Sequence, residues 1–251
     1  MDRKIRESIS VFFPVYNDAR TIGKLVRDVR GVLQRRFNKW EIILVNDASE
    51  DDSAQVVDAL ARSDGHIRVV HHETNRGYGG ALSSGFAHST GQLVFYTDGD
   101  GQYDPRELER LLDHLDHADI VNGFKVRRSD TFVRRIEGRF YHAVSRFLFQ
   151  LSVRDVDCDF RLLRRHVVDD IMPLWCSGGT IGVEMLAKAR EYGHHVATVP
   201  VNHYARPYGR SQFFRARRLA RSVREMFELW CLLVAGKKKK TPRGAGSTPA
   251  P

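Results

Sequence analysis

Cysteine is scarce in this sequence, and no long apolar run is present. The three cysteines, Cys158, Cys176 and Cys231, lie far apart and form neither a zinc-binding pattern nor an even set for disulfides. This usage favours a reducing compartment. No stretch reaches the ~18 apolar residues needed to span a bilayer, and the N-terminal segment lacks the pattern of a signal peptide. We therefore expect a cytoplasmic protein that is not an integral membrane protein.

Acidic residues are missing from two segments near the C-terminus, which carry much of the net charge of +9. Residues 236–251 include Lys237 to Lys240 and Arg243, and residues 206–224 include seven arginines, with no Asp or Glu in either segment. Such clusters attract nucleic acid or anionic lipid without distinguishing them. A solvated, functionally neutral face is the alternative. The Gly- and Pro-containing tail, 236–251, is expected to be disordered.

Strand-like and helix-like segments alternate through the first half of the chain. Short runs typical of buried strands lie at 8–13, 40–45, 67–71, 93–97 and 119–122. Segments with helical periodicity or helix-start signals lie between them, at 19–36, 53–62 and 105–116, and the glycine-rich turn at 75–80 opens a further helix that runs to about residue 88. This alternation predicts an α/β fold with a Rossmann-like, doubly wound and mostly parallel sheet flanked by helices.

The second half is expected to be richer in helices. Apolar residues recur every three or four positions in 133–151 and in 213–235, with arginines between them, and a further helix and strand are expected at 181–192 and 196–201. The two long amphipathic segments are typical of helices at a membrane surface. Packing of the 133–151 helix on the sheet as core is the more ordinary interpretation. We expect one domain over residues 1–235, with halves at about 8–123 and 124–235.

The strongest candidate site follows the predicted strand at 93–97. One glycine separates Asp98 from Asp100, and a second glycine separates Asp100 from Gln102. In open α/β sheets, ligands bind at the carboxyl ends of the strands. Paired carboxylates near an amide oxygen suit a hard cation such as Mg²⁺, which binds one or two carboxylates and substrate phosphate oxygens. A simple Asp-Gly turn before the next helix is the alternative.

Three other predicted strands also end in unusual polar residues. They are followed by Pro14, Tyr16 and Asp18, by Asn46 and Asp47, and by Arg76 in a glycine-rich turn. Each has a structural alternative: a strand exit for Pro14 and Tyr16, a helix cap for Asp47, and a plain connection for Arg76, although helix N-termini favour phosphate. The histidines, including His71, His72 and His203, show no spacing typical of metal ligands.

As a set, these motifs resemble the family-2 glycosyltransferases with the GT-A nucleotide-diphospho-sugar fold. The closest resemblance is to the dolichol-phosphate mannose synthase and polyprenol-phosphate glucose synthase branch. It spans about residues 8–230, and its motifs are 14–18, 45–49, 75–82, 98–105, 157–163 and 200–211.

The resemblance implies a role for each matching position. The nucleoside would lie along Pro14, Tyr16 and Asp18, with Asn46 or Asp47 at the base. Mg²⁺ or Mn²⁺ would be held against the diphosphate by Asp98 and Asp100, assisted by Gln102. Arg76 and Arg206 would neutralise the leaving nucleotide.

The chain also departs from the family pattern in four places. Asp18 stands where Glu is usual, and Asn46 where Asp is frequent. Asp159 begins a motif that often begins with Gly, and Gln212 stands where Lys is common. The first change is conservative. The others leave base preference and the acceptor side open.

The implied activity is a metal-dependent, inverting transfer of a single sugar, mannose or glucose, from a nucleotide-diphosphate sugar to a polyprenyl phosphate at the cytoplasmic face of a membrane. A lipid monophosphate is largely dianionic at pH 7 and needs no general base. Basic residues for this phosphate are Lys125, Arg127, Arg128, Arg134 and Arg135. Asp100, Arg206 and Arg134 are the expected catalytic residues; a solvated basic loop is the alternative for the acceptor group.

Two other functions are compatible with parts of the sequence. Transfer to a soluble hydroxylated acceptor would need a base, for which Asp159 and Glu184 are candidates. Glu184 is equally typical of a first-turn acid at a helix N-terminus. Arg161 is typical either of an ion pair with Asp157 or Asp159 or of a contact with the substrate. Nucleic-acid binding would use the basic clusters, but acids at successive strand ends would repel phosphate unless a metal is present. The sequence does not distinguish donors, acceptor length, the metal or the oligomeric state.

Overall fold

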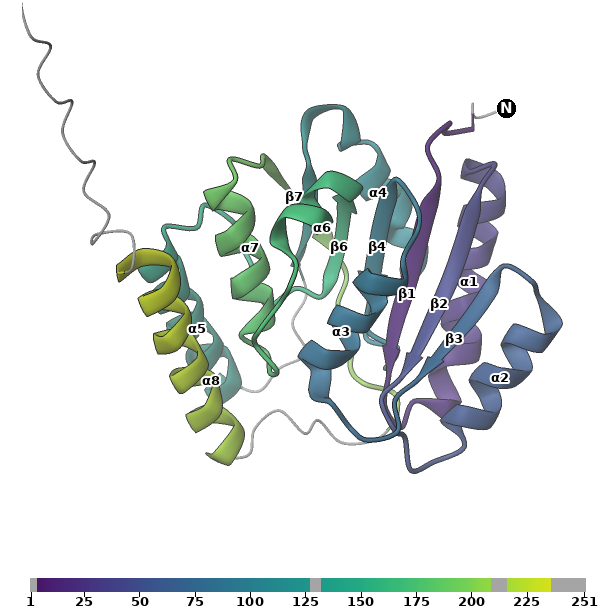
Figure 1. Ribbon diagram of the computed structural model, residues 1–251, viewed down its shortest axis with the longest axis horizontal. Helices are drawn as coiled ribbons and strands as arrows, with labels where there is room; N and C mark the ends of the chain where they lie inside the picture. Colours follow the sequence, from purple (N-terminus) through teal and green to yellow (C-terminus); the bar gives the residue numbers. More distant parts are fainter. Residues whose placement is uncertain (1–3, 127–131, 209–215, 236–251) are drawn as a thin grey trace, which may run out of the picture.

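The computed structural model describes residues 4–126, 132–208 and 216–235 (Figure 1). Within the helices that contain residues 132–140 and 216–221, the backbone of these residues is described and their side chains are not. The predicted tail at 236–251, Arg127, Arg128 and the segment 209–215 lie outside the described residues.

Within the described residues, seven strands form one sheet in the order β3-β2-β1-β4-β6-β5-β7. The strands are β1 (Ile9–Val15), β2 (Trp40–Asn46), β3 (Ile67–His71), β4 (Leu93–Thr97), β5 (Ile120–Lys125), β6 (Phe160–Arg164) and β7 (Val196–Val201). All neighbouring pairs are parallel except those of β6, which is antiparallel to β4 and β5. The expected mostly parallel sheet is therefore confirmed.

Helices cover both faces of the sheet (Figure 1). One face carries α1 (Ala19–Arg36), α2 (Ser53–Ser63) and α4 (Leu108–Leu112), and the other carries α3 (Gly77–His88), α6 (Arg165–Ile171) and α7 (Ile181–Glu191). Side chains alternate along β1. Val11 and Phe13 enter the first core, between the sheet and α1, whereas Phe12 enters the second core, on the α3 side, where it contacts Phe86 and Tyr96. Alternation along a strand buries both faces of β1.

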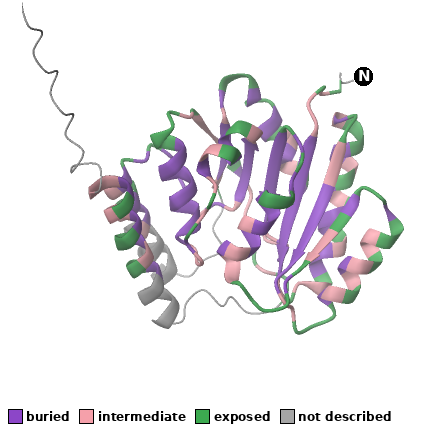
Figure 2. Cartoon of the chain, viewed as in Figure 1, coloured by how far each residue is buried: buried purple, intermediate pink, exposed green. Residues whose placement is uncertain are grey.

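A third apolar cluster lies beyond α7, at one end of the molecule (Figures 1 and 2). It joins α7 to α5 (Phe132–Phe149), α8 (Ala216–Trp230) and a π-helical turn η3 (Cys231–Ala235). The expectation that the helix near 133–151 packs on the sheet is wrong, because its described apolar residues pack in this cluster, around Leu186 and Leu229. No helix within the described residues combines the length and apolar character needed to cross a bilayer.

Three details differ from the sequence expectation. The segment 105–116 is broken into η1 (Pro105–Glu107), α4 and η2 (Leu115–His117), β5 continues to Lys125, and the short helix α6 was not expected. Leu108, Leu111 and Leu115 all reach the first core despite the break. Both 3₁₀ and α turns place such residues on one side, so their spacing does not distinguish an interrupted helix from a continuous one.

Candidate active site at the carboxyl edge of the sheet

The loops after β1 and β4 touch at the carboxyl edge of the sheet. Thr21 Oγ1 donates a 2.6 Å hydrogen bond to the carbonyl oxygen of Gly99. A Cβ at Gly99 would lie 2.8 Å from the Pro14 carbonyl oxygen and 3.3 Å from Asp18 Oδ2. Contacts this short exclude a side chain, so glycine lets the two backbones approach. The carboxylate of Asp18 therefore lies beside the Asp98–Asp100 loop.

The loops after β1 and β2 are fastened together by Asn17. Its φ of 59° lies in the left-handed region, which asparagine tolerates better than most residues. Its Oδ1 accepts a 2.8 Å hydrogen bond from the N–H of Glu50, and the N–H of Asp18 donates to Ser53 Oγ at 2.9 Å. These bonds fix the backbone from which Asp18 projects.

Asp100 is buried and bound on both oxygens. Its Oδ1 accepts the backbone N–H of Gln102 at 2.9 Å, and its Oδ2 accepts Nη2 and Nε of Arg206 at 2.6 and 3.1 Å. Arg206 lies more than 100 positions later in the chain, in the segment after β7. The structure thus brings together two of the predicted catalytic residues.

Asp98 lies at the start of the same loop and receives a hydrogen bond of 2.8 Å from Tyr78 Oη. Burial, followed by the nearby carboxylates of Asp159 and Asp100, raises the pKa of Asp98 well above its ordinary value. Burial also raises the pKa of Asp157 to about 7, against the opposing effect of the Lys125 ammonium. The site therefore concentrates carboxylates whose charge the surrounding side chains do not fully balance.

This donor set fits a hard divalent cation. Two carboxylates on one loop, completed by phosphate oxygens of a substrate, are a usual arrangement for Mg²⁺, and oxygen ligands also suit Mn²⁺. The raised pKa of Asp98 shows where a positive charge would be stabilising. Asp98 and Asp100 would hold the ion. The side-chain amide of Gln102 donates to the carbonyl oxygen of Tyr204 at 3.1 Å, which links this loop to the segment that carries Arg206.

Asn46 and Asp47 shape the neighbouring loops. Asp47 Oδ1 accepts the backbone N–H of Arg76 at 2.8 Å and lies 2.6 Å from Nδ1 of the buried His72. Asn46 Oδ1 accepts the N–H of Ser49 at 3.2 Å. Asp47 therefore holds the start of the glycine-rich turn in place rather than capping α2, whose N-cap residue is Asp52.

The glycine-rich turn brings Arg76 to the N-terminus of α3 with an exposed side chain. Gly79 packs against the 176–177 backbone, where a Cβ would lie 2.0 Å from the carbonyl oxygen of Cys176. The N–H of Gly79 donates to the carbonyl oxygen of Ser177 at 3.0 Å. This close packing fixes the turn from which Arg76 and Tyr78 project.

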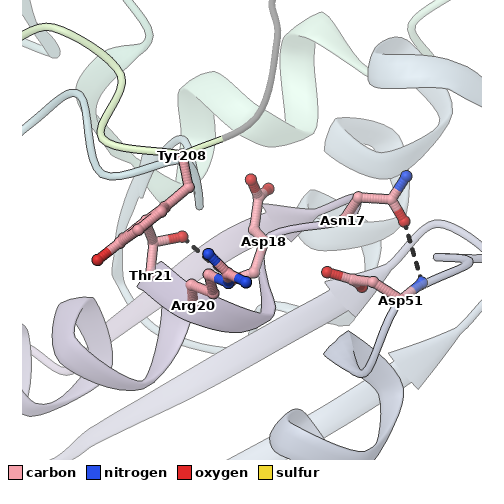
Figure 3. Close-up of a pocket in the computed structure, with 6 residues that line it drawn as sticks. All are labelled: Asn17, Asp18, Arg20, Thr21, Asp51 and Tyr208. Atoms are coloured by element: carbon pink, nitrogen blue, oxygen red, sulfur yellow. Dashed lines mark hydrogen bonds between the residues drawn. The ribbon is translucent and has the colours of Figure 1, made fainter.

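A surface pocket of about 180 Å³ opens next to Asp18. Figure 3 shows the Asp18 carboxylate between Asn17 and Tyr208. The other residues that line the pocket are Arg20, Thr21 and Asp51. The guanidinium carbon of Arg20 lies 5.3 Å from the centre of the Tyr208 ring. Pro14 is buried beneath this edge, and Tyr16 is half-buried. An aromatic ring beside polar groups is a suitable surface for a nucleoside.

The predicted acceptor-phosphate residues are described only in part. Lys125 is directed toward the acids: its Nζ donates to the carbonyl oxygen of Asp157 at 2.7 Å. Burial lowers the pKa of Lys125, but Asp155 and the other surrounding acids outweigh this effect and raise it. Arg127 lies outside the described residues, as do the side chains of Arg134 and Arg135. Their role remains a prediction.

Glu184 has a structural role. It is fully buried, accepts the N–H groups of Trp175 and Cys176 at 2.8 to 3.0 Å, and pairs with Lys188 at 2.7 Å. The contacts with Trp175 and Cys176 hold the segment before α7, against which the glycine-rich turn packs. A carboxylate with these partners is not available as a general base.

Two further residues, Tyr78 and Arg161, support the site through hydrogen bonds that the sequence did not predict. Tyr78 donates to Asp98, and the fully buried Arg161 donates to Tyr96 Oη at 2.6 Å and to the side chain of Asn122. The pairing considered for Arg161, with Asp157 or Asp159, is electrostatic: both acids feel its charge. A tyrosine inside a glycine-rich turn is the one local signal that pointed to Tyr78.

The chain is similar in sequence and in fold to known proteins. The family model described as glycosyl transferase family 2 matches residues 10–172. The chain belongs to glycosyl transferase family 2. That match spans the loops after β1, β2 and β4, and so most of the site described above.

Relatives within glycosyl transferase family 2 include two undecaprenyl-phosphate 4-deoxy-4-formamido-L-arabinose transferases. The protein from Sodalis glossinidius (strain morsitans) is 31% identical over 209 residues, and that from Enterobacter sp. (strain 638) is 30% identical over 207 residues. These matches cover 82% of this chain but only 63% and 62% of the relatives. The chain thus spans less than two thirds of their length.

Solved structures of glucosyl-3-phosphoglycerate synthase from Mycobacterium tuberculosis share the fold of this family 2 chain. The complex with Mn²⁺, uridine diphosphate and glucosyl-3-phosphoglycerate has a TM-score of 0.68 at 19% identity, covering 91% of this chain and 80% of that one. The complex with Mg²⁺ and uridine diphosphate has a TM-score of 0.67 at 19% identity, with the same coverage. The expected GT-A fold is thereby confirmed.

The crowded carboxylates predict a pH effect on stability. Burial, and then the Asp100 carboxylate, raises the pKa of Asp18 from 3.8 to about 7. A folded-state pKa above the unfolded value contributes stability below the unfolded pKa, which is lost as pH rises through the folded pKa. Asp18→Asn should therefore gain in Tm relative to the wild type as pH rises from about 4 to about 8. Calorimetry in EDTA measures the difference.

Asp64→Asn is the matched control, because its expected slope has the opposite sign. Burial alone would raise the pKa of Asp64, but hydrogen bonds from His66 and the charge of Arg30 outweigh it and lower the pKa. The wild-type advantage over Asp64→Asn should therefore shrink as pH falls. If the Tm difference from the wild type changed with pH in the same direction for both variants, the raised pKa of Asp18 would be contradicted.

Proposed function

We propose that this chain is a metal-dependent, inverting glycosyltransferase that moves a single sugar from a nucleotide-diphosphate sugar to a polyprenyl phosphate. The observation that carries the proposal is the group formed by Asp98, Asp100 and Arg206, in which two acids and one arginine from distant segments meet at the carboxyl edge of the sheet. Acids at that position would repel a diphosphate unless a cation lay between them.

Some of these residues would bind the donor, and others would stabilise the nucleoside diphosphate as it leaves. Asp18 and Tyr208 line the pocket beside the acids, where the nucleoside would lie. Mg²⁺ or Mn²⁺ held by Asp98 and Asp100 would supply positive charge to the departing diphosphate. The guanidinium of Arg206 contacts the Asp100 carboxylate. It would therefore lie near the departing diphosphate, on which negative charge develops in the transition state.

The acceptor assignment is supported by the names of the relatives and by the chemistry of a phosphate acceptor, which needs no general base. The similar proteins from Sodalis and Enterobacter are named as transferases to undecaprenyl phosphate. A phosphate dianion attacks the anomeric carbon through its own oxygen and gives inversion without a general base. Lys125, Arg127, Arg134 and Arg135 would receive that phosphate. The sugar is mannose, glucose or the 4-deoxy-4-formamido-L-arabinose of the relatives' names.

A soluble hydroxylated acceptor is the competing proposal, and Asp159 gives it specific support. Burial raises the pKa of Asp159, and its carboxylate in turn raises the pKa of Asp98. A raised pKa suits a general base near neutral pH. Glu184, the other candidate base, is fully buried and bound to three partners, which leaves Asp159 as the residue to test.

The decisive experiment uses radiolabelled GDP-mannose, UDP-glucose and the formamido-arabinose nucleotide with short polyprenyl phosphates, with and without EDTA. Lipid-linked product that EDTA abolishes is the expected result. Asp159→Asn separates the acceptors: with polyprenyl phosphate it should keep activity within about tenfold of wild type, whereas loss of about 10²-fold or more would indicate a base. Salt-sensitive duplex binding, with no sugar transfer to any acceptor, would instead favour nucleic-acid binding.

A lipid acceptor places the enzyme at a membrane, and we propose peripheral binding at the cytoplasmic face. Val223 and Phe227, both 64% exposed, lie one turn apart on α8, and Phe147 of α5 is 83% exposed. Four lysines follow at 237–240. Near an anionic leaflet each Lys or Arg contributes about 1 kcal/mol. Apolar side chains beside basic ones are typical of interfacial helices.

Sedimentation with anionic lipid vesicles tests this surface. Phe227→Asp should pellet less than wild type, whereas Tyr192→Asp, at an exposed aromatic residue at the end of α7, should pellet normally. High salt and carbonate should release the wild type. Protein that stays with the membrane through both washes would contradict peripheral binding.

A further inference from the structure

A second group of potential ligands lies at the edge of the sheet opposite the acids. Asp119 directly precedes β5, His166 is in the first turn of α6, and His194 is in the loop before β7. Each offers one ligand atom, and these atoms all lie within 4.8 Å of one another. Since β5 is parallel to β4 through their shared neighbour β6, the start of β5 is far from the ends where Asp98 and Asp100 lie.

We propose that Asp119, His166 and His194 form a structural binding site for a borderline transition-metal ion, of which Zn²⁺ is the representative. Two imidazoles and a carboxylate are a common zinc ligand set, and a water completes four-coordination. Ligands of a tetrahedral zinc ion lie about 3.4 Å apart, as its 2.0–2.2 Å bonds require. Asp119 Oδ1 and His166 Nε2 are 3.3 Å apart, so these two already have the separation that a shared ion needs.

The surrounding contacts orient the group. Asp119 Oδ2 accepts the N–H of His195 at 2.8 Å, which turns the other oxygen toward His166. The carbonyl oxygen of Asp119 accepts the N–H of Arg164 at 2.9 Å, so the backbone is fixed as well. Asp170 Oδ2 lies 2.8 Å from His194 Nε2. Carboxylates commonly support metal-ligating histidines in this way.

The site differs chemically from the one at the carboxyl edge. Nitrogen and oxygen donors together favour zinc and its neighbours, whereas the all-oxygen set of Asp98 and Asp100 favours Mg²⁺ or Mn²⁺. A bound ion would join three segments that the sequence separates, at residues 119, 166 and 194. Its effect would therefore fall on stability, and the proposal does not depend on the reaction that the chain catalyses.

Titration of the full chain with Zn²⁺ in excess Mg²⁺ tests the proposal. Calorimetry should find a zinc equivalent that His166→Ala lacks, and zinc should raise the Tm of the wild type but not of this variant. Co²⁺ should give the visible absorption of a tetrahedral ion. Asp170→Asn should weaken binding by about tenfold, as expected for an outer partner. His166 is exposed, so its replacement should leave the fold intact, which circular dichroism checks.

His88→Gln is the matched control, since this histidine lies on α3 outside the group and its ring Nδ1 lies 2.8 Å from the carbonyl oxygen of Ser84 in the same helix. It should bind zinc as the wild type does. Equal zinc binding by the wild type and His166→Ala, or loss of binding in His88→Gln, would overturn the proposal and leave hydrogen bonding as the sole role of the group.

Discussion

Replacing Asp98 or Asp100 by asparagine should lower kcat for sugar transfer by about 10³-fold. Each replacement removes a negative ligand from the predicted cation site, and stabilisation of charge on a leaving group is typically worth several kcal/mol. Asparagine keeps the size of the side chain, so the loss reports charge rather than packing. Transfer of radiolabel to polyprenyl phosphate measures the rate, and the Tm rise caused by Mn²⁺ with nucleotide measures cation binding.

Both readouts should change together in these variants. Metal-free Asp98→Asn should be at least as stable as the wild type, because burial and two neighbouring carboxylates raise the pKa of Asp98 and make its charge unfavourable. Asp113→Asn, at an exposed position at the end of α4, is the control and should transfer sugar normally. Activity above a tenth of wild type in both site variants would refute the cation site.

The position of these acids could be predicted from the sequence because it depends on local pattern. An apolar run such as 93–97 predicts a strand, and the next polar residues then lie at its carboxyl end. Parallel strands bring all such ends to one edge, so Asp18 and the Asp98–Asp100 loop were expected to meet. In the structure a Cβ at Gly99 would lie 3.3 Å from Asp18 Oδ2, so the two segments do lie side by side.

Strand direction and side-chain partners could not be predicted in the same way. The run Phe160–Leu163 has the same apolar character whether it enters the sheet parallel or antiparallel, so the antiparallel placement of β6 gave no signal. Asn46 or Asp47 was expected at the nucleotide base, but the partners of the Asp47 side chain, His72 and the backbone N–H of Arg76, lie 25 and 29 positions away and were not predicted. Such pairings depend on how whole loops pack, and no short motif encodes them.

The histidine group shows the same limit. Metal sites are recognised in a sequence when ligands recur at short, regular spacing. Asp119, His166 and His194 come from three separate segments that meet only because β5 and β7 pair and α6 follows β6. The sequence therefore suggested no metal role for any histidine, and the group became visible only in the folded chain.

Arg206→Ala should lower kcat by about 10²-fold to 10³-fold, because it removes a charge aimed at the region where the leaving diphosphate becomes more negative. Arg206→Lys should recover little of the rate. Two nitrogens of Arg206 contact Asp100 Oδ2, at 2.6 and 3.1 Å, and an ammonium cannot reproduce this planar, forked geometry. The same transfer assay gives the rate, with Mn²⁺ affinity measured separately by calorimetry.

The comparison of rate with metal affinity decides what Arg206 does. If it acts on the leaving group, Arg206→Ala should bind Mn²⁺ at least as tightly as the wild type, since removing the guanidinium frees Asp100 Oδ2 and deletes a like charge near the cation. Only kcat would then fall. If Arg206 merely holds Asp100 in place, Mn²⁺ affinity and kcat should fall in parallel, and the catalytic assignment would be wrong. Arg206 lies outside residues 10–172, the part matched by the family model, so the family match gives no support for its role and the experiment has to decide it.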